Sequence, residues 1–308
     1  MSASKVQFER WITREDSTWA FLVFQKHNTE LTNMYISHLA ASKFSFTTLG
    51  KKLGAQFEDP YEKWFPPVEE MVYTGFYDVK SWSNSYNQFD NWVNLNCVMA
   101  MSANLETYMA TVISLALESD VGVLYGASQR IDGMEIVKYG REQPFEFDNY
   151  IIGCTKGDWH SRIAYFEKIF GSCPLVLEEN IKSLEALRKL RNNVGHAFGR
   201  DIDASRQHDT IEISKMASLK REKTIEYLKL IFRVAKEIDK QLFVNNIGAY
   251  QDLLFFHKLK PTLKHGDKIK AREMGNHAAI LKKSLNSHTA KPAGKTYCKG
   301  LISYYEGI

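Results

Sequence analysis

The sequence predicts an all-α protein: a four-helix up-and-down bundle with an aromatic-rich N-terminal segment and a basic C-terminal extension. Two observations support this class. Apolar residues recur at the three- and four-residue spacing of amphipathic helices in four separate stretches. The loops between these stretches are short, apart from one insertion, and short loops favour antiparallel neighbours. We therefore divide the 308 residues into segments 1–91, 92–247 and 248–308.

The N-terminal segment, residues 1–91, is expected to be mainly helical. Apolar residues recur at helical spacing between Leu31 and Leu39. Asn28 and Thr29 precede them and belong to residue types that cap helices. Prolines then interrupt any long helix, at Pro60, Pro66 and Pro67.

Aromatic residues are concentrated in this part of the chain, where 19 of the 39 Phe, Tyr and Trp precede residue 93. The densest run contains Tyr61, Trp64, Phe65, Phe76, Tyr77, Trp82 and Tyr86. Such rings can stack on the bases of single-stranded nucleic acid, or they can pack against the next segment. Because few Lys or Arg residues lie among them, we favour packing.

The middle segment is expected to form the bundle. Its four amphipathic stretches are residues 92–117, 158–170, 177–198 and 215–243. Residues 119–157 are rich in turn-forming residues and read as an insertion that holds a short hairpin.

The C-terminal extension is basic, with eleven Lys and Arg against four Asp and Glu between residues 249 and 308. Its candidate RNA-binding side chains are Lys258, Lys260, Lys264, Lys268, Lys270 and Arg272. With Tyr297, Tyr304 and Tyr305 nearby, these cations could neutralise RNA phosphates; a solvated surface or a partner-binding extension is the alternative. A short helix is expected near residues 278–285. Because the last apolar stripe ends near Leu242, we expect the bundle to fold without this extension.

Several classes of protein are disfavoured. No run approaches the roughly 18 apolar residues of a membrane span, and the first residues lack an apolar signal-peptide core. The four cysteines lie far apart with no C-x-x-C pair, and common nucleotide-binding and metalloprotease motifs are absent from the sequence. We therefore expect a cytoplasmic protein with no membrane contact, cofactor or resident metal.

One cluster carries recognisable chemistry, in residues 187–201. At 100° per residue, Arg191, Asn192 and His196 share a helix face beside the apolar stripe, with Gly195 between them. Arginine is a permanent planar cation that matches phosphate oxygens, and histidine transfers protons near neutral pH. Together with an orienting amide, these groups suffice to cleave a phosphodiester without a metal ion.

The Arg-x4-His spacing occurs a second time, at Arg272 and His277. The second copy lacks an Asn after the Arg and has no apolar stripe beside it. We therefore take the copy at Arg191 as the functional one and the copy at Arg272 as a coincidence.

The motif Arg191-Asn192-x-x-x-His196, on the third helix of an expected four-helix bundle, resembles the R-x4-6-H motif of the HEPN superfamily. The resemblance covers about residues 92–246 and depends on helix order as much as on the motif. It implies a metal-independent endoribonuclease that works as a homodimer, of the kind found in bacterial toxin–antitoxin and anti-phage systems. An antitoxin or another defence-system protein is then an expected partner.

By this resemblance, Arg191 would hold the scissile phosphate, His196 would act as general base or acid, and Asn192 would orient the pair. The products would be a 2′,3′-cyclic phosphate and a 5′-hydroxyl end. One departure is Phe198, because HEPN toxins modified by nucleotidyltransferase antitoxins often carry Tyr there. The alternative is a non-catalytic HEPN module that binds RNA, a nucleotide or a partner protein, with Arg191 and His196 as ordinary helix-end residues.

Overall fold

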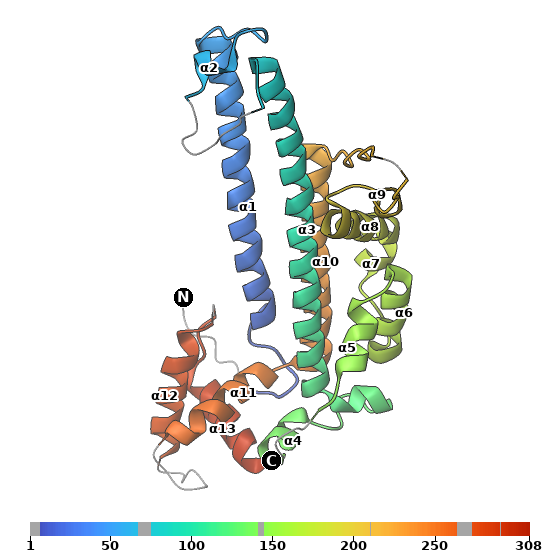
Figure 1. Ribbon diagram of the computed structural model, residues 1–308. Helices are drawn as coiled ribbons and strands as arrows, with labels where there is room; N and C mark the ends of the chain where they lie inside the picture. Colours follow the sequence, from blue (N-terminus) through green and yellow to red (C-terminus); the bar gives the residue numbers. More distant parts are fainter. Residues whose placement is uncertain (1–6, 67–74, 141–144, 210, 264–272, 290) are drawn as a thin grey trace. The chain divides into compact units, whose positions relative to one another are not determined.

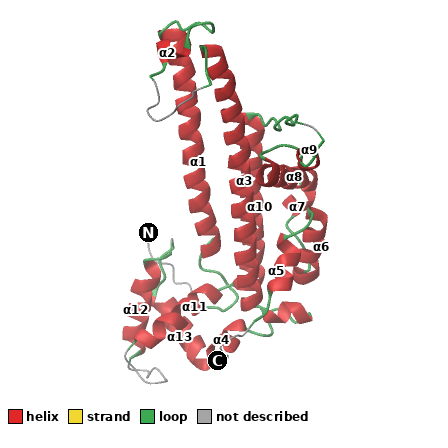
Figure 2. Cartoon of the chain, viewed as in Figure 1, coloured by secondary structure: helices red, strands yellow, loops and turns green. Residues whose placement is uncertain are grey.

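All regular structure in the computed structural model is helical (Figures 1 and 2). The structure describes residues 7–66, 75–140, 145–209, 211–263, 273–289 and 291–308. Within these ranges no strand forms, and the isolated backbone bridges are Pro60–Asp78 and Asp120–Asp132. The predicted all-α class is therefore confirmed. None of the described helices combines the length and apolar character that crossing a membrane requires.

The chain divides into two compact units. Unit 1 contains Met1–Phe24, Leu105–Ile181 and Phe232–Ile308, and unit 2 contains Gln25–Asn104 and Lys182–Ile231. Unit 1 thus draws residues from all three segments defined from the sequence. The helices that contribute several residues to each unit are α1 (Trp19–Phe46), α3 (Val79–Ser119) and α10 (Arg221–Leu242).

Helix α1 begins earlier than its sequence indicated. Thr18 caps it, because the Thr18 hydroxyl accepts a hydrogen bond from the amide of Phe21 at 3.1 Å. The expectation that Asn28 and Thr29 cap this helix is wrong, since both lie inside it. The buried rings of Phe21 and Phe24 supply the apolar face that extends the helix toward its N-terminus.

Helix α3 also begins before its expected start at Trp92. The Asp78 carboxylate caps it by accepting from the amide of Ser81 at 2.7 Å, and this hydrogen bond lowers the pKa of Asp78. The first half of α3 is polar apart from its aromatic residues, so the aliphatic pattern that marks the second half is missing there.

The other elements of unit 2 are short or lie beside α3. They are η1 (Thr47–Lys52, a π-helical turn), α2 (Tyr61–Trp64), α8 (Ile181–Ala197) and α9 (Ile202–Ser205). Polar side chains join α1 and the stretch before α10 to α3: the Tyr35 hydroxyl donates to Asn94 at 2.6 Å, and Asn94 in turn donates to the carbonyl of Leu219 at 3.0 Å. These bonds fix the extended stretch before α10 against α3.

Unit 1 contains the insertion, which forms helices and not the expected hairpin. The elements are η2 (Val121–Tyr125, a 3-10 turn), α4 (Gly133–Tyr139), α5 (Asp148–Thr155), α6 (Trp159–Phe170) and α7 (Leu175–Glu179). The hairpin expectation is wrong because Asp132 caps α4, accepting from the amide of Met134 at 2.8 Å. Helix α6 ends at Gly171, as predicted, where a φ of 80° suits glycine.

The C-terminal extension is a folded part of unit 1. After η3 (Phe243–Ile247) it forms α11 (Tyr250–Leu259), η4 (Lys260–Thr262), α12 (Met274–Asn286) and α13 (Lys295–Gly307). Helix α12 confirms the short helix expected near residues 278–285, whereas α13 was not expected. The apolar side chains that fill this part have less than 1% of their surface exposed: Tyr250, Leu253, Phe256, Leu281, Leu285, Leu301 and Ile302.

The extension is tied to the rest of unit 1 at Arg10 and Asp132, where the amide of Ala249 donates to the carbonyl of Arg10 at 2.9 Å. Arg10 makes a bidentate ion pair with Asp132, at 2.8 and 2.9 Å, and donates to the carbonyl of Ile247 at 2.8 Å. Tyr304 of α13 donates to the same Asp132 carboxylate at 2.5 Å. The expectation that the bundle is complete before residue 249 is therefore wrong, because core contacts continue to the end of the chain.

Candidate functional site

Helix α8 positions the candidate catalytic residues in its last two turns. Its buried face is formed by Leu184, Leu187 and Val194, which recur at helical spacing. Arg191 lies at the edge of this face and is half-buried, whereas His196 is exposed to solvent. The helix expected over residues 177–198 is thus present, and it begins at Ile181 after the separate turn α7.

Arg191 and Asn192 lie together at the start of this region. The Arg191 Nη1 atom donates to the Asn192 Oδ1 atom at 3.2 Å, so the amide holds one edge of the guanidinium. The guanidinium of arginine has further donors in a fixed plane, which suit two phosphate oxygens at once. His196 follows on the next turn, where its side chain is exposed to solvent.

Gly195 lies on the solvent side of α8. A methyl group added there would find its nearest neighbour, Met99 Sδ, at 3.9 Å, which is ordinary contact. Glycine inside a helix costs about 1 kcal/mol relative to alanine. The packing of unit 2 therefore does not require glycine at this position, although glycine makes the helix less stable than alanine would.

The end of α8 has an unusual backbone. Phe198 has a φ of 55° and Gly199 a φ of 77°, so two consecutive residues are left-handed. Gly199 is required there, because a Cβ atom would lie 2.9 Å from Leu95 Cδ1. Phe198 has no such freedom, and an aromatic residue with positive φ is strained. The chain then continues into an extended stretch, where the amide of Ala217 donates to the carbonyl of Gly199 at 2.7 Å.

Aromatic and cationic side chains surround this helix end. The ring centroids of Trp92 and Phe198 are 6.4 Å apart, and the Arg200 guanidinium carbon lies 5.1 Å from the Phe198 centroid. Phe198 is 55% exposed. Phe198, Arg200 and Trp92 were not among the predicted site residues, although the spacing of Trp92 from Phe89 and Tyr86 marks one face of α3.

The predicted RNA-binding residues of the C-terminal extension differ in their surroundings. Lys258 is exposed on α11, whereas the Lys260 ammonium pairs with Glu306 at 3.0 Å. Lys264, Lys268, Lys270 and Arg272 lie outside the described residues. Of the three tyrosines expected to accompany them, Tyr297 and Tyr305 are buried and cannot stack on bases, whereas Tyr304 is partly buried and its hydroxyl donates to Asp132. An RNA contact by these lysines stays a prediction.

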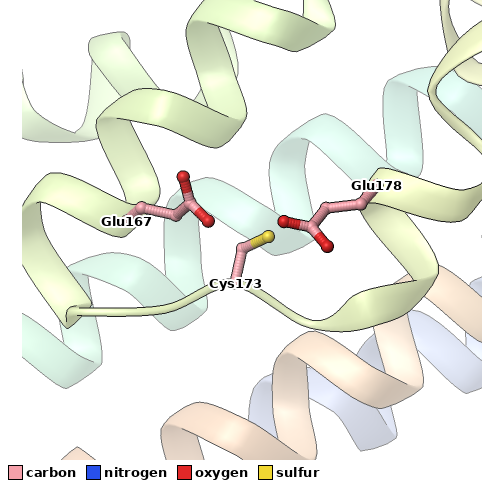
Figure 3. Close-up of side chains that lie close together, drawn as sticks. All are labelled: Glu167, Cys173 and Glu178. Carbon is pink, nitrogen blue, oxygen red and sulfur yellow. The ribbon is translucent and has the colours of Figure 1, made fainter.

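A second cluster, which the sequence analysis did not anticipate, lies in unit 1. Figure 3 shows the carboxylates of Glu167 and Glu178 pointing toward the sulfur of Cys173 from either side. One ligand atom from each residue lies within 4.8 Å of the others. Burial, followed by the two carboxylates, raises the pKa of the Cys173 thiol to about 12, so the thiol keeps its proton and a metal ion would have to displace it.

A shallow surface groove of about 520 Å³ lies near this cluster, also within unit 1. Its charged lining residues are Arg233 and Lys240 on one hand and Glu179 and Glu237 on the other. Because the two signs balance, the groove has no charge preference that identifies a ligand.

Comparison with known proteins adds no relative to this description. No family model, no curated protein and no solved structure matches the chain. The end of α8 is the part of the described structure that combines a cation, an amide and an exposed imidazole, in Arg191, Asn192 and His196.

Proposed function

We propose that this protein is a metal-independent endoribonuclease of HEPN type, with Arg191, Asn192 and His196 as its catalytic residues. The observation that carries the proposal is the end of α8, where an exposed imidazole follows one turn after the hydrogen-bonded Arg191–Asn192 pair. The chain order of α3, α6, α8 and α10 supports a four-helix HEPN-like bundle around this motif.

The chemistry needs one proton acceptor, one proton donor and a cation. In the proposed reaction the RNA 2′-oxygen attacks the adjacent phosphorus, His196 takes the 2′-hydroxyl proton, and the bond from phosphorus to the 5′-oxygen breaks. The leaving 5′-oxygen takes its proton from a second His196 side chain in its protonated form, which gives a 2′,3′-cyclic phosphate and a 5′-hydroxyl end. Arg191 neutralises the charge that develops on the phosphate oxygens, and Asn192 keeps the guanidinium in place.

A homodimer would complete this site. One imidazole that accepts a proton from the 2′-hydroxyl cannot at the same moment donate one to the leaving oxygen, so two His196 side chains serve better than one. The exposed Gly195 supports close approach of a second copy, because no contact inside unit 2 requires a glycine there. Gly195→Ala is accordingly expected to raise the melting temperature of the monomer slightly and to weaken the dimer, measured by scanning fluorimetry and light scattering.

The biological role we propose is that of a cytoplasmic toxin or anti-phage effector, held in check by an antitoxin or another defence-system protein. The same helix could instead serve a non-catalytic HEPN module that binds RNA, a nucleotide or a partner protein. The two functions differ in a single observable, which is whether the purified protein cuts RNA.

The test is RNA cleavage by the wild-type protein and by variants of the site. Arg191→Ala and His196→Ala should each lower the cleavage rate by about 100-fold or more. Arg206→Ala and His208→Ala are matched controls, since both residues are exposed cationic or imidazole side chains of unit 2 outside the site. Cleavage should continue in EDTA. Loss of activity in EDTA, or full activity in both α8 variants, would contradict the mechanism, and a folded protein that never cuts RNA would favour the non-catalytic module.

A further inference from the structure

Four aromatic residues form one stripe along the first half of α3. Trp82, Tyr86, Phe89 and Trp92 follow each other at intervals of four, three and three residues, which places them on one face of the helix. Their consecutive ring centroids lie 5.2, 6.1 and 5.8 Å apart. Phe198, at the end of α8, continues the stripe at 6.4 Å from Trp92. We call Phe89, Trp92 and Phe198 the ring row.

The ring row is not part of the core of unit 2. Phe89 is 46% exposed and Phe198 is 55% exposed, whereas the core side of α3 is formed by Leu95 and Val98, which are fully buried. Phe89 and Trp92 are nearly parallel, with 18° between their ring planes, so both present flat faces along the same direction. Large rings left in a row at the surface mark a place where another molecule binds.

The Phe198 ring takes its place in this row with a strained backbone. Its φ of 55° is one that glycine adopts easily and aromatic residues rarely do. The ring lies between Trp92 and the Arg200 guanidinium, and Arg200 is held in turn by a 2.8 Å hydrogen bond from its Nε to the carbonyl of Ser214. Strained residues that persist in spite of an easy alternative concentrate at functional sites.

The charge of the segment that carries Phe198 indicates the class of ligand. Residues 182–231, which carry Phe198 and the catalytic motif, contain eleven Lys and Arg against seven Asp and Glu. A row of flat rings with a guanidinium group at one end, here Arg200 beside Phe198, is suited to unpaired bases with a phosphate backbone beside them. A duplex cannot use such a surface, because its bases are already stacked and paired.

We propose that the ring row is a stacking platform for single-stranded RNA: the base next to the scissile phosphate lies on Phe198, the following bases lie on Trp92 and Phe89, and Arg200 contacts the intervening backbone. This inference rests on the proposed function for the position of the scissile phosphate. It adds that the enzyme selects unpaired RNA and that the strand runs from α8 along α3.

The experiment measures binding of a short, fluorescently labelled 2′-O-methyl RNA strand, which cannot be cleaved, to the full-length protein. Phe198→Gly and Phe89→Ala should each weaken binding of this strand by about 10-fold, because base–ring stacking contributes that much per base. Phe198→Trp should bind as the wild type does. Phe57→Ala is the matched control, because Phe57 is 58% exposed in the same unit and lies outside the ring row.

Phe198→Gly also separates binding from folding. Glycine relieves the positive φ, so this variant should keep or raise the melting temperature while it loses RNA affinity. A variant that loses both would assign Phe198 to packing and overturn the proposal. The proposal also fails if the wild type does not bind the strand, if Phe198→Gly and Phe89→Ala bind like the wild type, or if they change only the oligomeric state.

Failure of the proposed function is visible separately. If the ring-row variants weaken strand binding but no variant or wild-type sample cuts unmodified RNA, the platform stands and the nuclease proposal fails. If the wild type cuts RNA and the ring-row variants cut and bind equally well, the nuclease proposal stands and the platform fails.

Discussion

The chain contains the Arg-x4-His spacing twice, and the two copies have opposite surroundings. In unit 2, His196 is exposed at the end of α8, behind an arginine whose partner amide is the next residue. In unit 1, His277 lies on α12 and is 2% exposed. The spacing alone therefore does not identify a site, and the side of the helix on which the imidazole falls decides what it can do.

The aromatic residues repeat this contrast. On α3 the rings of Phe89 and Trp92, which follow the aromatic run that was expected to pack, lie at or near the surface. In the C-terminal extension Tyr297 and Tyr305 were expected beside RNA, and both are buried. Burial raises the pKa of the Tyr305 hydroxyl, which agrees with a structural side chain. The basic composition and the nearby tyrosines thus predicted an RNA-binding extension, whereas this part of the chain folds into helices with a buried core.

The largest expected effect follows from this correction. A chain that stops at Gly248 lacks the buried rings of Tyr250 and Tyr297 and the hydroxyl of Tyr304 that contacts Asp132. We expect such a chain to be insoluble or to lack a cooperative thermal transition in unit 1, measured by circular dichroism and proteolysis. A truncated chain with the melting temperature of the full protein would show that the extension contributes nothing to the core.

The second prediction compares the two histidines directly. His277→Ala should lower the free energy of unfolding by about 2 kcal/mol, because a buried side chain is removed from α12, and should leave the RNA cleavage rate of the folded protein unchanged. His196→Ala should do the reverse, with a large loss of cleavage and almost no change in stability. A variant at His277 that folds normally and loses cleavage would mean that the wrong copy was chosen.

Helices with an aliphatic amphipathic pattern were predicted correctly from the sequence. Segments whose secondary structure depends on tertiary contacts were not. Helices α6 and α8 lie within a few residues of their expected bounds because their leucines and isoleucines repeat at helical spacing. Residues 215–220 were expected to be helical and are extended instead, because Ala217 and Leu219 donate their amides to Gly199 and Asn91. Helix α13 was missed because its lysines, glycines and tyrosines show no aliphatic stripe.

The same distinction applies to the candidate site. The register of α8 was enough to predict that Arg191, Asn192 and His196 lie on or beside the solvent face. The position of Phe198 between Trp92 and Arg200 depends on a left-handed backbone and on α3, about a hundred residues earlier, so no local pattern contains it. Glu167 and Glu178 were missed for a related reason, because Cys173 was considered only with the other cysteines.

The third prediction concerns the buried ion pair of Arg10 and Asp132, whose carboxylate also accepts the hydrogen bond of Tyr304 in the extension. Arg10→Met removes the cation from Asp132 and leaves a buried carboxylate without its bidentate partner. The free energy of unfolding should fall by about 3–5 kcal/mol, measured by urea denaturation. The double variant Arg10→Met with Asp132→Asn should recover part of this loss, because the uncompensated charge is gone. Equal stability of the Arg10→Met protein and the wild type would show that the buried ion pair does not stabilise the fold.

The smallest expected effect is a pH dependence in the extension. Burial, then Lys260 and Lys258, lowers the pKa of His257, whose Nδ1 lies 2.7 Å from the Tyr305 hydroxyl. The folded state therefore keeps this ring neutral at a pH where the unfolded chain, with a histidine pKa near 6.5, already binds a proton. Because the unfolded state binds more protons in that window, stability should fall as the pH drops below about 6.5.

His257→Gln should make the unfolding free energy depend less on pH between pH 7 and pH 5 than it does in the wild type, whereas His208→Gln, at an exposed position of unit 2, should not. An unchanged slope in the His257 variant would mean that this imidazole titrates alike in the folded and unfolded chains, and the contrast between a structural histidine in the extension and a solvent-facing one on α8 would then depend on His277 alone.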